Sequence, residues 1–117
     1  MQRERVLIQH WQKHLKELCS LGKVAIWGAG AKGVTFANLL DPHSKLIDCI
    51  VDLNPNKQGR FVPGTGHPIV SYRDLPKRNV ATAILMNPNY REENQEYLKK
   101  AGIKISLIGQ ERNEIND

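Results

Sequence analysis

The stretch VAIWGAGAKGVTF, residues 24–36, decides the fold of this chain. Its first four residues are apolar, the next six form the turn GAGAKG, and a helical pattern follows. When a buried strand turns through glycines into a helix, the backbone N–H groups at the helix start can surround an anion. The stretch therefore predicts a strand-turn-helix unit suited to a phosphate.

The glycines of this turn, Gly28, Gly30 and Gly33, have the spacing of the dinucleotide-binding fingerprint. There the first glycine makes the tight turn, the second lets the backbone approach a pyrophosphate, and the third lets helix and strand pack closely. An acidic residue at the end of the second strand binds a ribose hydroxyl, and Asp52 has that place. Lys32 either pairs with a phosphate or points to solvent. The alternative is a scaffold whose glycines make only a tight connection and bind no ligand.

Strand and helix patterns alternate along the rest of the chain. We predict a Rossmann-like α/β fold, a three-layer sandwich with a mainly parallel sheet of about five strands in the order 3-2-1-4-5. It forms one domain over 1–117, with an amphipathic helix over 1–20, a core over 23–108 and a polar tail over 109–117. The strands are predicted at 23–27, 46–52, 69–70, 79–86 and 103–108. After the N-terminal helix, a helix is predicted at 34–40, a short helical turn at 71–74, and a last helix that runs from its cap Asn89 to Ala101.

The composition argues against a membrane protein, a secreted protein and a nucleic-acid-binding protein. The chain has 117 residues, 40% of them hydrophobic and 25% charged, and no apolar run approaches the roughly 18 residues of a membrane span. No signal-peptide pattern is present, so we expect a soluble, cytoplasmic protein. The net charge of +5 is scattered along the chain, which favours an anionic small molecule over nucleic acid. Cys19 and Cys49 are predicted to be reduced, and no metal-ligand cluster is visible.

A second stretch, DLNPNKQGRFVPGTGHPI over 52–69, resembles a signature of the C-terminal domain of SAM-dependent C-methyltransferases that act on nucleotide-linked deoxysugars. A related loop also occurs in polysaccharide-biosynthesis dehydratases and sugar acyltransferases, so a neighbouring sugar-modifying group is an alternative. The chain departs from the family at Met86, where a Trp is usual, and at Leu107-Ile108-Gly109, where prolines are usual. The matching positions are Gly28-Ala29, Lys32-Gly33, Asp52, Asn54-Pro55, Lys57-Gln58-Gly59, Pro63-Gly64 and Asn87.

This resemblance implies a Rossmann-like domain that helps to hold a nucleotide-linked sugar. Methyl transfer itself would occur in a separate SAM domain, in cis or in trans, with a zinc-binding domain also involved. The chain shows neither of these domains, so we expect it to bind no cofactor alone and to be non-catalytic on its own. It would then be a fragment, a subunit that meets its catalytic partner, or a stand-alone domain with another use.

Several loop residues are candidate ligand contacts. Lys57 and Arg60 can neutralise a diphosphate, or they can be cations of a solvated turn. His67 can act as an acid, a base or a hydrogen-bond donor near a sugar, or it can be structural. Asn54 belongs to the same loop signature. Asn87, after the fourth strand, can bind a ligand near the switch point or cap the next helix.

Three functions remain open at this stage. The first is a nucleotide-sugar-binding domain related to the C-methyltransferases. The second is a small NAD-binding or redox-sensing module, which the glycine spacing and Asp52 favour. The third is an assembly domain that binds no ligand and docks through its N-terminal helix, with Trp11 at the interface.

Overall fold

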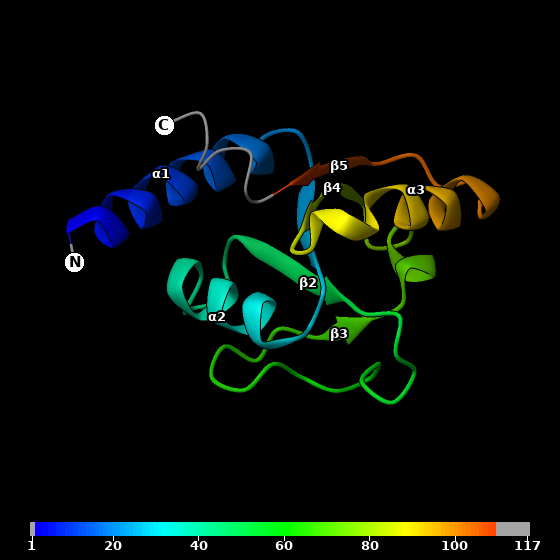
Figure 1. Ribbon diagram of the computed structural model, residues 1–117, viewed down its shortest axis with the longest axis horizontal. Helices are drawn as coiled ribbons and strands as arrows, with labels where there is room; N and C mark the ends of the chain where they lie inside the picture. Colours follow the sequence, from blue (N-terminus) through cyan, green and yellow to red (C-terminus); the bar gives the residue numbers. More distant parts are fainter. Residues whose placement is uncertain (1, 110–117) are drawn as a thin grey trace.

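Strand β1 (Lys23–Trp27) lies at the centre of a five-stranded sheet in the computed structural model, which describes residues 2–109 (Figure 1). It is flanked by β2 (Ile47–Val51) and β4 (Val80–Leu85). The edges are β3 (Ile69–Val70) and β5 (Ser106–Gly109). Every neighbouring pair is parallel, and the order is β3-β2-β1-β4-β5. The predicted sheet order and α/β class are confirmed.

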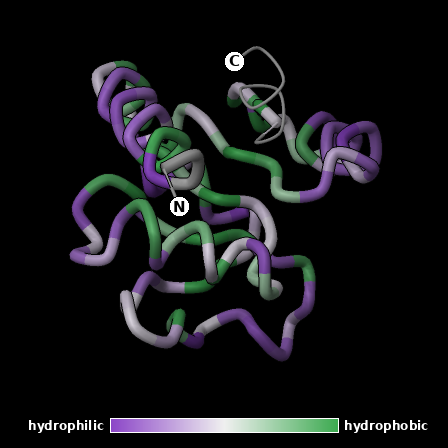
Figure 2. The backbone as a smooth tube through the Cα atoms, turned by 60° about the vertical axis from the view of Figure 1, so that its left-hand side comes forward, coloured by the Kyte–Doolittle hydropathy of each residue, from purple (hydrophilic) through white to green (hydrophobic). Residues whose placement is uncertain are grey.

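The apolar run of β1 is buried on both faces of the sheet. Successive strand side chains point to opposite faces, so Val24 and Ile26 enter one layer of the core while Ala25 and Trp27 enter the other. A strand with no exposed face needs no polar alternation, which explains its continuous hydrophobic sequence. Figure 2 shows hydrophobic residues concentrated along the strands, whereas the helices Gln2–Cys19 and Arg91–Lys100 outside them are largely hydrophilic.

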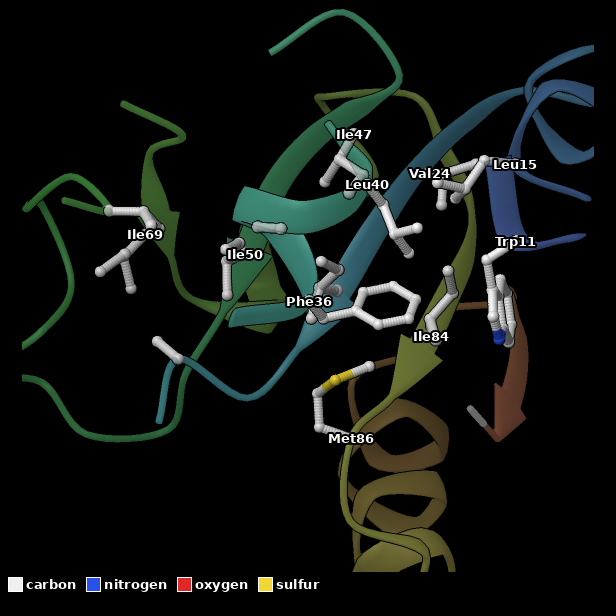
Figure 3. Close-up of a cluster of buried hydrophobic side chains, with 14 residues drawn as sticks. Trp11, Leu15, Val24, Phe36, Leu40, Ile47, Ile50, Ile69, Ile84 and Met86 are labelled. Carbon is white, nitrogen blue, oxygen red and sulfur yellow. The ribbon is translucent and has the colours of Figure 1, made fainter. Parts of the chain in front are cut away.

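Two helices cover the first face of the sheet. They are α1 (Gln2–Cys19) and α2 (Ala31–Leu40). The predicted amphipathic helix is observed, with Trp11 and Leu15 buried; the Trp11 ring meets that of Phe36 edge-on, with centroids 5.3 Å apart. Figure 3 shows Trp11, Phe36 and Met86 among the side chains of this layer. Burial of these large side chains holds the start of α2 firmly above the sheet.

The second face is covered by α3 (Arg91–Lys100) and by the short 3-10 turn η1 (Tyr72–Asp74). The rings of Trp27 and Tyr72 stack with centroids 6.0 Å apart, and Leu98 of α3 packs into the same layer. Helical elements on both faces complete the predicted three-layer arrangement (Figure 1). Within residues 2–109, no helix is long and apolar enough to cross a membrane.

Several predicted boundaries differ from the structure. The helix predicted at 34–40 already starts at Ala31, and the strand predicted at 103–108 spans Ser106–Gly109. Asn89 does not cap α3, because a 3-10 turn, η2 (Pro88–Tyr90), comes first. The side-chain oxygen of Asn87 accepts the N–H of Asn89 at 3.0 Å and caps that turn, and α3 starts only at Arg91. The polar tail does not start at Gly109, which is the last residue of β5 and pairs with Leu85. The remainder of that predicted tail, 110–117, lies outside the described residues.

Candidate functional site

An open pocket of about 830 Å³ lies at the carboxyl ends of β1 and β4. In the observed strand order these two strands form the switch point, where ligands of open α/β sheets bind. Three segments line the pocket: the glycine turn after β1, residues 52–53 after β2, and residues 85–94, which lead from β4 into α3. The predicted site residues among them are Gly28, Gly30, Lys32, Gly33, Asp52 and Asn87.

The glycine turn has the tight geometry that its sequence predicts. Gly28 has a φ of +124°, a backbone conformation that favours glycine, and its N–H donates to the Val51 carbonyl at 2.7 Å. A Cβ atom at Gly33 would overlap the Gly28 carbonyl oxygen, so only glycine lets α2 pack this closely on β1. A Cβ at Gly30 would meet no atom within 4 Å and would project from a residue that lines the pocket.

The start of α2 forms the electropositive wall of the pocket. The first N–H groups of a helix have no intrahelical acceptors and carry the positive end of the helix dipole. Gly30 is the N-cap residue and supplies no side-chain cap, and the first turn contains no acidic residue. The cation Lys32 lines the same wall. This wall therefore offers hydrogen-bond donors and positive charge to an anion.

Asp52 fastens the glycine turn to the segment after β2. One carboxylate oxygen accepts the N–H of the buried Ala29 at 3.0 Å, and the other accepts the N–H of Asn54 at 2.8 Å. Because each carboxylate oxygen has two lone pairs, Asp52 can still accept a ligand hydroxyl. Its place in the pocket agrees with the predicted position, and its bond to Ala29 gives it a structural role that the sequence did not predict.

The opposite wall comes from η2 and α3 and contains residues that sequence reasoning missed. Tyr90, Glu93 and Asn94 line it together with the predicted Asn87. Asn94 is only 3% exposed, and its side-chain oxygen has no hydrogen-bond partner among the described residues. One signal could have revealed it, since Asn94 precedes the apolar Leu98 by four residues and therefore shares the inner face of α3.

The loop between β2 and β3 is ordered, but its cations lie outside the pocket lining. Backbone bonds join Val62 N–H to the His67 carbonyl at 2.8 Å and Ile69 N–H to the Arg60 carbonyl at 2.8 Å. The Asn54 side chain accepts the N–H of Asn56 within the first turn of the loop. Lys57, Arg60 and Asn54 do not line the pocket, so the structure does not bring these predicted contacts to the glycine turn.

His67 is also away from the pocket, and the structure gives it a structural role. Its side chain is fully buried; Nε2 lies 2.8 Å from Asp41 Oδ2 and Nδ1 lies 2.6 Å from Thr65 Oγ1. Asp41 in turn accepts the N–H groups of Lys45 and Ile47, both at 2.8 Å. This buried network ties the long loop to the segment between α2 and β2. The expectation that His67 faces a sugar is corrected.

Stability should fall in acid because of Asp41. Burial acts to raise the pKa of Asp41, but hydrogen bonds from the Ile47 N–H, from His67 and from the Lys45 N–H outweigh it and lower that pKa. A carboxylate with a lowered folded-state pKa stabilises the fold above its unfolded value of about 3.9, and this contribution disappears as pH falls through the folded-state value. We expect the urea midpoint to drop between pH 5 and pH 3.

The matched variant for this prediction is Asp41→Asn, which keeps the shape and one acceptor oxygen. Its urea midpoint at pH 6 should lie below that of the wild type, and its further decline toward pH 3 should be shallower because position 41 no longer titrates. Equal acid dependence of the two proteins would show that other carboxyl groups control the transition.

The two cysteines take no part in the site. Burial, together with the neighbouring Asp48 carboxylate, raises the pKa of Cys49 to about 12, and burial also raises the pKa of Cys19. Both thiols therefore stay protonated near neutral pH, and neither lines the pocket. Both are free, as predicted. Among the described residues, no group of three or more His, Cys, Asp or Glu side chains is placed to hold a metal ion.

Comparisons with known proteins add two findings. Residues 3–107 match a family described as the C-methyltransferase C-terminal domain. Among solved structures, the crystal structure of RSP, a Rex-family repressor, matches with a TM-score of 0.52 and 18% identity, over 74% of this chain and 51% of that one. The chain thus spans about half the length of that repressor, and the likeness supports the fold alone. The search of curated protein sequences found no match.

Proposed function

Because this chain belongs to the C-methyltransferase C-terminal domain family, we propose that its pocket holds a nucleotide-linked sugar for a methyltransferase reaction. The methyl donor SAM would be bound by another domain, in cis or in trans, and that domain would carry out the transfer. The role of this chain is then to bind and orient the acceptor. The family match spans every segment that lines the pocket.

The observation that carries the proposal is the contrast between the two walls of the pocket. On one side, the start of α2 and Lys32 favour a diphosphate. On the other side, Asn87 and Glu93 offer oxygen acceptors that suit the hydroxyl groups of a ribose or sugar, and Asp52, beside the glycine turn, offers a further acceptor. The volume of about 830 Å³ lies within the usual range for small-molecule sites, roughly 300–1,000 Å³. A ligand with a diphosphate in its middle and hydroxyl groups at its ends can therefore bind the positive wall and the oxygen acceptors at the same time.

A second candidate function is NAD binding. The spacing of Gly28, Gly30 and Gly33 and the position of Asp52 favour it, because a dinucleotide also combines a pyrophosphate with ribose hydroxyls. The two functions differ in the ligand that stabilises the folded chain, so a panel of ligands separates them. A domain that serves only in assembly would respond to no ligand of the panel.

The test is a thermal-unfolding series with UDP, TDP, UDP-glucose, TDP-glucose, NAD and SAM. A ligand bound only by the native state raises stability by RT ln(1 + [L]/Kd). We expect a rise in melting temperature with the nucleotide sugars and none with NAD or SAM. A rise with NAD alone would reject the nucleotide-sugar function in favour of the NAD module.

Two lysines provide a matched test of where the phosphates bind. Lys32 lines the pocket and Lys57 does not, although both belong to the family signature. Lys32→Ala should weaken binding of UDP-glucose or TDP-glucose roughly tenfold, because it removes a charge-assisted hydrogen bond to a phosphate. Lys57→Ala should leave the affinity within about twofold. Isothermal titration of both variants checks this, and the reverse ranking would move the diphosphate to the long loop.

A further inference from the structure

The side chain of Asn94 is the least satisfied polar group in the pocket wall. It is 3% exposed, and its side-chain oxygen has no hydrogen-bond partner among the described residues. Buried polar atoms in folded proteins are nearly always paired, because an unpaired one carries the full cost of leaving water. The oxygen itself has almost no accessible surface, while Asn94 as a residue lines the pocket. A turn of the Asn94 amide toward the pocket would therefore let this oxygen meet a partner that arrives with the ligand.

The surroundings of Asn94 define what that partner must be. Its neighbour Glu93 lines the same wall and carries a carboxylate, so the wall repels phosphate oxygens. The phosphate-attracting groups lie on the opposite wall, at the start of α2. An oxygen acceptor beside a carboxylate binds a donor on an uncharged part of the ligand. Hydroxyl groups and ring N–H groups both meet this requirement.

We propose that Asn94 determines ligand specificity by accepting a hydrogen bond from a hydroxyl or ring N–H of the bound ligand. The inference rests on the proposed function, since it assigns the nucleoside or sugar end of the ligand to the α3 wall and the diphosphate to the glycine turn. Tyr90, which is exposed and lines the same wall, offers an aromatic face beside that end of the ligand.

The test uses Asn94→Leu, which replaces the amide with an apolar side chain of similar size. Without ligand, the variant should melt about 3–5 °C above the wild type, because the unpaired buried oxygen is gone. Its affinity for UDP-glucose or TDP-glucose should fall at least tenfold, while its response to pyrophosphate should match that of the wild type. Gln95→Leu, at the exposed neighbouring position, is the control and should alter neither property.

Comparison of three probes locates the donor. If the affinity of Asn94→Leu for UDP or TDP alone is already tenfold weaker than that of the wild type, the hydrogen-bond donor belongs to the nucleoside. If its affinity falls only for the sugar-linked nucleotides, the donor belongs to the sugar. Either result supports the proposal.

Two outcomes overturn the proposal. One is an Asn94→Leu variant that binds the nucleotide sugars as well as the wild type does, which leaves the proposed function intact. The other is a ligand-free variant that melts below the wild type, which shows that Asn94 stabilises the fold. If NAD is the one ligand of the panel that binds the wild type, and Asn94→Leu weakens NAD binding, the proposed function fails while the role of Asn94 stands. A wild-type chain that responds to no probe rejects both.

Discussion

Replacing His67 with alanine should lower the free energy of unfolding by about 3–5 kcal/mol, a large fraction of what a domain of this size possesses. The imidazole is fully buried and lies 2.8 Å from the Asp41 carboxylate, which is itself 3% exposed. Removing the ring leaves that carboxylate without its side-chain partner and creates a cavity beside the long loop. Urea denaturation followed by circular dichroism measures the loss.

The control for this prediction is His43→Ala. His43 is exposed and lies only two residues from Asp41, so its removal should change stability by less than about 0.5 kcal/mol. A His67→Ala variant as stable as this control would contradict the structural role. Under the alternative that His67 contacts a sugar, the variant would keep its stability and lose ligand binding, which is the opposite of the expected pattern.

His67 shows where sequence reasoning fails. A histidine in a loop rich in glycine and proline looks exposed, because nothing local reveals that Asp41, 26 residues earlier, lies against it. Tertiary contacts of this kind depend on how the loop folds over α2. The same holds for Lys57 and Arg60, because the loop backbone sets the direction of their side chains and the sequence shows only their charge. They lie outside the pocket lining, and a contact with a diphosphate stays a prediction.

The local patterns were reliable because their physical cause is local. Glycine spacing, a buried apolar strand and a helix start lie within 13 residues and predict the turn. The end of the next apolar run predicts Asp52 directly after β2, and Asp52 lies there. Sheet order followed from the connection rules for parallel strands. Asn94 is not found from the sequence although its spacing to Leu98 is visible, because a polar residue four positions before an apolar one does not by itself indicate burial.

Gly33→Ala should damage both the fold and the site. The added Cβ would overlap the backbone carbonyl oxygen of Gly28, which no side-chain rotation can relieve. The first turn of α2 must therefore move away from β1, which disturbs the packing of Phe36 beneath it. We expect a loss of about 1–3 kcal/mol in the free energy of unfolding. We also expect no ligand-dependent rise in melting temperature, because the displaced N–H groups no longer face the phosphates.

Gly30→Ser is the matched variant in the same turn. At Gly30 a Cβ meets no atom within 4 Å, φ is −78°, and a serine oxygen can cap the N–H groups of α2. This variant should be at least as stable as the wild type. The serine side chain projects where a pyrophosphate must approach the backbone, so binding of the nucleotide sugars should still be lost. Melting curves with and without UDP-glucose or TDP-glucose measure both effects.

Together the two variants separate a ligand site from a scaffold. If the turn holds a phosphate, both variants lose the ligand response and only Gly33→Ala loses stability. If the glycines serve only to connect β1 tightly to α2, Gly33→Ala still loses stability, but Gly30→Ser behaves like the wild type with every ligand. The open space at Gly30 then has no steric function, and the placement of the diphosphate at the glycine turn is rejected. The response of Gly30→Ser therefore distinguishes the two, because the close packing at Gly33 is needed in either case.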